Sequence, residues 1–237
     1  AASDVYKRQN VLSLISGNGF GREGYPVRGL FSIPFAGLTE DGLPTFINQD
    51  GQKTISSFNF QEYEKLDFLK YEGPTDPTIT GSFGNILTYK NLKLNVFVTY
   101  SFGNVIRLDP VFSNAYSDLD AMPKEFKNRW MKAGDENVTN IPTIVSTRMN
   151  QQYAYLNMAY NAYNYSDVRI ADGGFIRLKE ISLSYDLPAK VINFFRLNKL
   201  QLKLQATNLC LLYADSKLNG QDPEFFRSGG VSTPVPK

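Results

Sequence analysis

Apolar and polar residues alternate with a period of two in two segments of the second half of the sequence. In residues 200–209, one face carries Leu200, Leu202, Leu204 and Ala206, and the other carries Gln201, Lys203, Gln205 and Thr207. Successive side chains of a strand point to opposite faces, so this pattern predicts a strand with one apolar face. Residues 175–187 alternate in the same way, but the phase slips between Leu178 and Ile181. One extra residue near Lys179 and Glu180 restores a common face, which predicts a β-bulge.

Residues 78–100 show the same alternation on both sides of a short polar break. If Lys90 and Asn91 form a two-residue turn, Tyr89 lies opposite Leu92. One continuous apolar face then holds Gly81, Phe83, Leu87, Leu94, Val98 and Tyr100. This register predicts a hairpin with one apolar and one polar face. Asn85 is an exception on the apolar face that the pattern does not explain.

The remaining sequence is richer in turns and polar residues. Its patterns predict the end of a strand at residues 10–15, an irregular strand at 25–38 interrupted by prolines, and short helices at 61–70, 122–136 and 188–195. Short connections at 90–91 and 188–199 contrast with long ones at 16–77, 107–174 and beyond 214. Outer-membrane barrels combine short periplasmic turns with long external loops in this way.

Composition narrows the possible chemistry. The 237 residues include no histidine and one cysteine, so a catalytic triad with histidine, an intrachain disulfide and a zinc cluster are all excluded. Cys210 follows apolar residues and is predicted to be a small buried side chain. Asp50 and Gly51 favour a turn over a calcium loop, and no carboxylate pair indicates acid–base catalysis. The sequence therefore predicts no enzyme, no metal site and no cofactor. A net charge of +2 without a basic stripe also argues against nucleic acid.

Three motifs carry a family resemblance. DGGFIRLKEISLSYDLPAKV (172–191), LKLQATNL (202–209) and GQDPE (220–224) stand in an order and spacing that resemble the C-terminal part of SusC/RagA-type TonB-linked outer-membrane transporters. The similarity extends over roughly Gly24 to Lys237. It implies an all-β fold, namely an antiparallel transmembrane β-barrel segment with long extracellular loops, part of a 22-stranded TonB-dependent receptor barrel.

The resemblance also implies a function and partners. It implies active uptake of glycan or peptide nutrients across the cell outer membrane, in contact with membrane lipid. A SusD-like surface lipoprotein is the implied partner, and the TonB complex would act through an N-terminal part not contained in this sequence. Residues 1–9 resemble a translated adapter tail, and residues 10–237 are expected to be a barrel portion truncated at both ends.

Candidate contact residues follow from the two faces. A charge facing lipid near the bilayer centre costs about 2–4 kcal/mol, so the polar face is expected to line the lumen. The lumen-facing candidates are Lys93, Arg177, Lys179, Lys203 and Gln205. Five tyrosines, namely Tyr153, Tyr155, Tyr160, Tyr163 and Tyr165, indicate either an extracellular stacking surface for sugar rings or a partner protein, or the aromatic girdle or upper wall of a barrel. The girdle or barrel wall is the favoured interpretation.

Two other protein classes fit the alternating pattern. A soluble secreted β-sandwich such as a carbohydrate-binding module would use the apolar face as its core. A plugless porin or barrel adhesin would use the same strands without energy coupling.

Overall fold

The computed structural model describes residues 10–16, 22–112, 124–153, 155–194, 197–224, 226–227 and 231–232. The predicted adapter-like tail at residues 1–9 lies outside the described residues. The chain forms two compact units. Unit 1 comprises Ala1–Asp76, Asn104–Asp172 and Ser216–Lys237, and unit 2 comprises Pro77–Gly103 and Gly173–Asp215.

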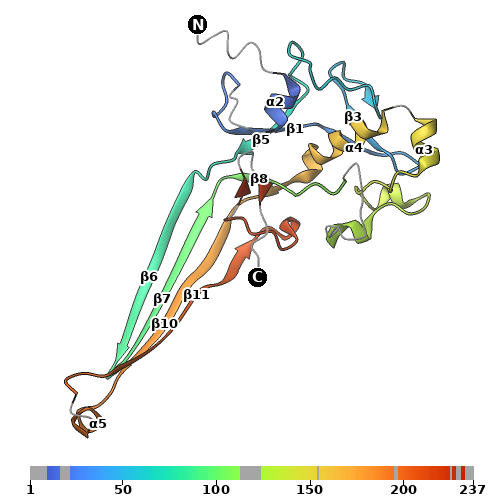
Figure 1. Cartoon of the computed structure of the whole chain (residues 1–237). Coiled ribbons are helices and arrows are strands. Elements are labelled where there is room, and N and C mark those ends of the chain that lie inside the picture. Colours follow the sequence, from blue (N-terminus) through green and yellow to red (C-terminus); the bar gives the residue numbers. More distant parts are fainter. Residues whose placement is uncertain are drawn as a thin grey trace. The chain divides into compact units, whose positions relative to one another are not determined.

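Unit 2 is a four-stranded antiparallel sheet with the order β11-β10-β7-β6 (Figure 1). Its strands are β6 (Ile79–Tyr89), β7 (Leu92–Phe102), β10 (Phe175–Asp186) and β11 (Gln201–Ala214). The short helix α5 (Ala189–Phe194) lies between β10 and β11. The hairpin, the two later strands and the helix after Pro188 are therefore confirmed.

The register of the hairpin is the one that the sequence predicts. Tyr89 pairs with Leu92, and the turn between them has Lys90 at a φ of 52°. Glycines make room for aromatic rings on the facing strand. A Cβ at Gly84 would lie 3.1 Å from the Phe97 ring, and one at Gly81 would overlap the Tyr100 hydroxyl. Each glycine therefore lets an aromatic side chain cover its backbone.

The predicted bulge in β10 is also confirmed. The register shifts between Leu178 and Glu180 in the pairing with both neighbouring strands. The adjacent strand β11 contains Asn208 at a φ of 52° at the same level, between residues paired to Glu180 and Leu178. An extra residue in a strand restores the common side for the residues that flank it. Leu178 and Ile181 accordingly pair with Val98 and Val96.

Unit 1 contains shorter elements. Its helices are α2 (Val11–Ile15), α3 (Thr147–Gln152) and α4 (Leu156–Asn164), with 3-10 turns η1 (Lys124–Asn128), η2 (Asp135–Asn137), η3 (Asp167–Arg169) and η4 (Ser216–Leu218). Its strands are β1 (Gly29–Ser32), β2 (Phe35–Leu38), β3 (Pro44–Ile47), β4 (Lys53–Thr54), β5 (Lys70–Pro74), β8 (Val105–Arg107), β9 (Ile170–Asp172), β12 (Phe226–Arg227) and β13 (Val231–Ser232). They pair as β1-β5, β2-β3-β4 and β12-β13-β8-β9. The irregular strand at 25–38 is confirmed as β1 and β2, which Pro34 separates.

Residues 10–15 form the helix α2 rather than the predicted strand end. The Asn10 side chain accepts a hydrogen bond from the backbone N–H of Ser13 at 2.9 Å and caps the helix. Val11, Leu14 and Ile15 are buried, and their spacing places them on one helical face. The capping side chain and the helical spacing of the apolar residues therefore favour a helix here, although the apolar run alone suggested a strand.

Two predicted helices of unit 1 do not form. In 61–70, the Glu62 carboxylate accepts backbone N–H groups of residues 63–65 and closes a turn, and Lys70 already begins β5. In 122–136, the described part contains only the short turns η1 and η2. Gly134 has a φ of 102°, and Asp135 accepts the N–H groups of Met131 and Lys132. Side-chain acceptors compete with helical hydrogen bonds in both places.

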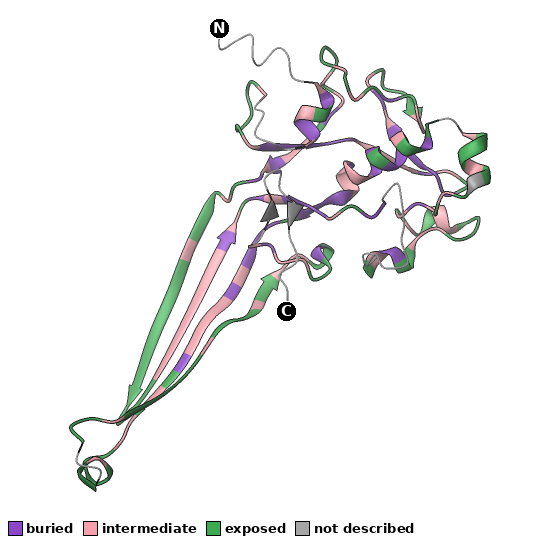
Figure 2. Cartoon of the chain, viewed as in Figure 1, coloured by how far each residue is buried: buried purple, intermediate pink, exposed green. Residues whose placement is uncertain are grey.

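Unit 1 has one hydrophobic core built from two long chain segments. Segment 10–76 contributes Val11, Leu14, Ile15, Phe31, Ile33, Leu43, Phe46, Phe58 and Leu69, and segment 104–172 contributes Val111, Phe112, Phe126, Leu156, Ala159, Tyr160, Ala162 and Tyr163. The buried residues follow β1, β3 and α4 (Figure 2). Among the described residues, no helix has the length and apolar character needed to cross a membrane.

Candidate lipid-facing and lumen-facing surfaces

The paired residues of unit 2 divide its sheet into two faces, because residues directly opposite each other lie on the same side. The apolar face consists of Ile79, Gly81, Phe83, Asn85, Leu87, Tyr89, Leu92, Leu94, Val96, Val98, Tyr100, Phe102, Ile176, Leu178, Ile181, Leu183, Tyr185, Leu202, Leu204, Ala206, Cys210 and Tyr213. No charged side chain is among them. Large side chains are exposed, with Phe83 at 64% and Leu204 at 75%. A continuous exposed apolar face of this kind marks a surface that contacts lipid or another protein.

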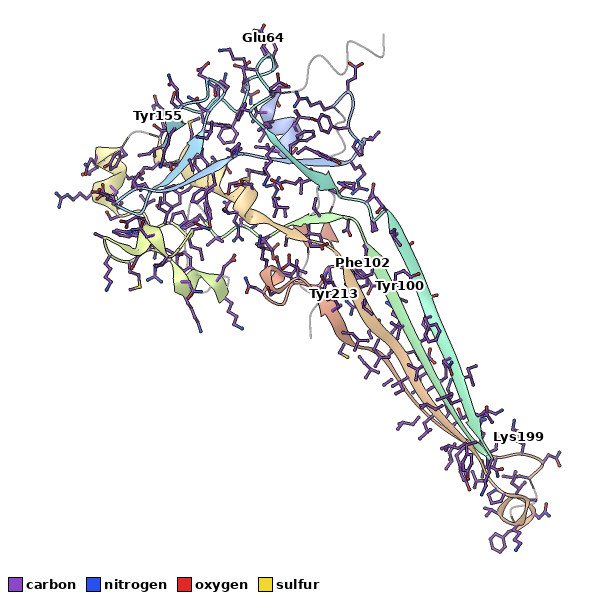
Figure 3. All side chains as sticks on the ribbon, turned by 180° about the vertical axis from the view of Figure 1, so that it is seen from behind. Glu64, Tyr100, Phe102, Tyr155, Lys199 and Tyr213 are labelled. Carbon is purple, nitrogen blue, oxygen red and sulfur yellow. The ribbon has the colours of Figure 1, made fainter. Side chains whose placement is uncertain are left out.

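Aromatic residues occupy both ends of the apolar face. Tyr89 and Tyr185 lie at the end that carries the Lys90 turn. Tyr100, Phe102 and Tyr213 lie together at the other end, far from Lys199 (Figure 3). The centroid of the Phe102 ring lies 6.2 Å from that of Tyr100 and 6.1 Å from that of Tyr213.

Leucine, isoleucine and valine dominate the band between these aromatic ends. Leu92 and Tyr100 are eight residues apart on β7, which corresponds to about 26 Å along the strand. β6 and β7 have 11 residues each, the length of a tilted membrane-spanning strand. The apolar band between two aromatic rows matches the outer wall of a transmembrane barrel.

The opposite face brings together the predicted lumen-facing residues. Ser184 pairs with Lys93 on β7 and with Lys203 on β11. In the adjacent row, Gln205 pairs with Ser182, and beyond the Glu180 row Arg177 pairs with Thr99. Lys179 lies in the bulge between Leu178 and Ile181, and both of these flanking residues belong to the apolar face. The alternation therefore leaves Lys179 on the polar side with the other four.

The polar face also contains residues that the sequence pattern did not single out. Asn95 donates a side-chain hydrogen bond to Glu180 at 3.2 Å, across β7 and β10. Ser182 is buried, and Arg177 is buried with its guanidinium 5.7 Å from the Phe175 ring centre. Both side chains belong to β10, which has a neighbouring strand on either side. Lys93, Lys203 and Gln205 are exposed.

The five tyrosines do not form one exposed surface. Tyr160 and Tyr163 are buried in the core of unit 1, and Tyr153 and Tyr165 pack against it while partly buried. Only Tyr155 is exposed, at 71%, where it projects from unit 1 (Figure 3). Neither expected arrangement, a stacking surface or a girdle, fits Tyr160 and Tyr163. The reason is α4, whose helical spacing turns Leu156, Ala159, Tyr160 and Tyr163 toward the core.

Cys210 is exposed, contrary to the expectation of a buried side chain. It pairs with Leu178 on the apolar face of β11. The apolar residues near Cys210 in the sequence therefore belong to an exposed face of the sheet and not to a core.

A fully buried arginine joins separate parts of unit 1, and the sequence patterns did not reveal it. Arg107 donates from Nη2 to the carbonyl oxygens of Ile15 and Phe31, each at 2.8 Å. Its guanidinium lies 5.1 Å from the Tyr165 ring centre. Burial lowers the pKa of Arg107 to about 10, while Tyr165 and Glu72 act in the opposite direction. The side chain therefore remains cationic at neutral pH and fixes the end of α2 to β1.

Arg169 makes a second buried connection. It forms an ion pair with Glu125 at 2.6 Å and donates to the Asp109 carbonyl at 2.6 Å. Glu125 in turn accepts a hydrogen bond from Asn219 at 3.2 Å, which ties the chain next to η4 to the rest of unit 1. Burial raises the pKa of Tyr163 to about 12, and Arg169 opposes this shift. The sequence gives no sign of this connection, because its members are far apart along the chain.

A search of protein-family models gave no match. The chain is 25% identical over 209 residues to TonB-dependent receptor P3 of Formosa agariphila, which covers 85% of this chain and 18% of the relative. The chain is thus similar in sequence to a TonB-dependent receptor. It spans about a fifth of the length of the relatives that it matches.

Solved structures establish the fold. The chain matches the RagAB peptide transporter with a TM-score of 0.55 and 21% identity, over 86% of this chain and 20% of the other. The RagAB peptide importer in the 'closed-closed' state gives a TM-score of 0.53 and 22% identity, over 86% and 21%. The predicted fold class, an antiparallel segment of a transporter barrel, is confirmed. A β-sandwich would bury the apolar face of unit 2, which is exposed instead. The names of these relatives describe a receptor and peptide transporters.

Proposed function

We propose that this chain is part of an outer-membrane transporter that takes up oligosaccharide or peptide nutrients with energy from the TonB complex. The observation that carries the proposal is the two-faced sheet of unit 2 in a relative of TonB-dependent receptors. Its apolar face bears no charge between two aromatic rows, and its polar face holds the lysines. In this assignment, the apolar face contacts lipid and the polar face lines the lumen.

The chain connections support an orientation in the membrane. β6 and β7 join through Lys90 and Asn91, and β10 and β11 join through the short segment that contains α5. The other ends of these four strands continue into the long segments of unit 1. Short periplasmic turns and long external loops are typical of such barrels. We therefore assign the two short connections to the periplasm and unit 1 to the cell surface, where a SusD-like lipoprotein would bind.

The proposal is tested with the full-length protein in its own outer membrane. We expect the protein in the outer-membrane fraction and expect uptake of labelled oligosaccharides or peptides that stops when the proton gradient is collapsed. Uptake that persists without the gradient would identify a passive porin. A protein found in the aqueous fraction without detergent would contradict the membrane assignment and favour a secreted binding module.

A further inference from the structure

The polar face of unit 2 carries more cationic than acidic side chains. It carries the four cationic side chains Lys93, Arg177, Lys179 and Lys203. It carries two carboxylates, and both have partners within unit 2. Glu180 accepts the hydrogen bond from Asn95, and Asp186 lies 3.8 Å from the Lys199 ammonium. Cationic groups therefore exceed acidic groups on the face that we assign to the lumen.

Two of these cations lie in one row of the sheet. Ser184 on β10 pairs with Lys93 on one side and with Lys203 on the other. Neighbouring strands are about 4.8 Å apart, so the two lysine backbones are separated by about 10 Å, with a serine hydroxyl between them. The four-carbon stem of lysine is flexible, so both ammonium groups can reach one anion above Ser184.

Neither lysine is used in holding the sheet together. Both side chains are exposed. Within the part of the chain that the structure describes, the ion pairs of unit 2 involve neither Lys93 nor Lys203, whereas Lys199 has Asp186. Of the other two cations of this face, Arg177 is buried against Phe175, and Lys179 lies in the bulge of β10 and is partly buried. Lys93 and Lys203 are thus the two cations of this face whose side chains are exposed to a solute.

We propose that Lys93, Ser184 and Lys203 form a binding row for anionic groups, so that the transporter prefers acidic substrates. This inference rests on the proposed function, because it requires the polar face to line the substrate path. Carboxylates of acidic peptides or of uronic-acid oligosaccharides supply the anionic group. Two ammonium groups and a hydroxyl donate hydrogen bonds to such a group, and cationic side chains that line a pore favour anions.

The test uses the full-length transporter and two matched pairs of labelled probes. One pair is a glutamate-rich and a serine-rich octapeptide, and the other is a galacturonic-acid tetramer and a galactose tetramer. We expect the acidic member of the transported pair to be favoured by about ten-fold at low salt, and less at high salt. The variant Lys93→Gln with Lys203→Gln is expected to lose most of this preference while uptake of the neutral member stays within about two-fold.

The matched control removes two lysines from the short connections, as Lys90→Gln with Lys190→Gln, and is expected to keep the preference. Equal uptake of acidic and neutral probes by the wild-type protein would overturn the inference, as would an unchanged preference in the Lys93 and Lys203 variant. If none of the probes is transported, the proposed uptake fails for these substrates. The anion preference is then measured as binding of the same probes to the purified protein, and equal binding of each pair would overturn it.

Discussion

Arg107 shows how one side chain can organise the core of unit 1. A buried guanidinium loses its hydration, and this cost is offset only where nearby groups accept its protons. Here the carbonyl oxygens of Ile15 and Phe31 accept from the same nitrogen, and the Tyr165 ring faces the charge. Arg107 therefore acts as a structural tie between α2 and β1.

We expect Arg107→Ala to lower the free energy of opening of α2 and β1 by about 3 kcal/mol, because two buried carbonyls lose a charged donor. Hydrogen exchange of the full-length protein measures this effect, and amides of α2 and β1 should exchange about a hundred times faster. Arg148→Ala is the control, because Arg148 is exposed on α3. Equal protection in the two variants would show that Arg107 does not hold these elements.

The sheet of unit 2 keeps its two faces separate by means of its bulge. Without the extra residue at Lys179, the residues from Phe175 to Leu178 would exchange faces with respect to β7. Arg177 would then lie on the apolar face, and Leu178 on the polar face. The bulge therefore has a direct consequence for membrane insertion, because it keeps the guanidinium out of the lipid-facing band.

Adjacent residues on β11 provide a direct test of the two faces. Leu204→Lys places a charge on the apolar face and is expected to destabilise the inserted protein by about 2 kcal/mol. Gln205→Lys places the same charge on the polar face and is expected to change stability by less than about 0.5 kcal/mol. Urea titration of the full-length protein folded in lipid vesicles measures both values. Equal destabilisation would mean that the apolar face does not contact lipid.

At the scale of the whole molecule, the long connections between strands are not independent loops. Segments 10–76 and 104–172 share one hydrophobic core, and Asn219 links the third segment to Glu125. Contacts within this core, such as the Phe35 ring 5.8 Å from Tyr163, join residues that are far apart in sequence. A change in the packing of one segment should therefore alter the packing of the others.

Deletion of residues 107–174 from the full-length protein is expected to reduce uptake more than any single substitution of a lumen-facing residue, such as Gln205→Ala. The deletion removes about half of the shared core and leaves Phe35 without the Tyr163 ring. Uptake assays together with protease digestion of intact cells measure function and loop folding in parallel. Normal uptake by the deletion variant would contradict this ranking.

The sequence alone determined the sheet of unit 2. Alternation of apolar and polar residues specified both faces, the slip between Leu178 and Ile181 specified the bulge, and Lys90 with Asn91 specified the turn. These signals are local, because neighbouring strands of a meander repeat the same period and a short turn fixes their register. The motifs of 172–191 and 202–209 lie in these same strands, so the family resemblance and the alternation predicted the same fold from the same residues.

Only the tertiary structure decided which apolar residues face a core. Tyr160 and Tyr163 are buried because α4 packs on residues from the start of the chain, whereas Cys210 is exposed because its strand presents an outer face. The pairing of Arg107 with Ile15 and Phe31 likewise joins positions separated by 92 and 76 residues. Such contacts depend on how distant segments meet, and no periodicity along the chain encodes them. Strand alternation is a local property of the backbone, while burial is a property of the assembled chain.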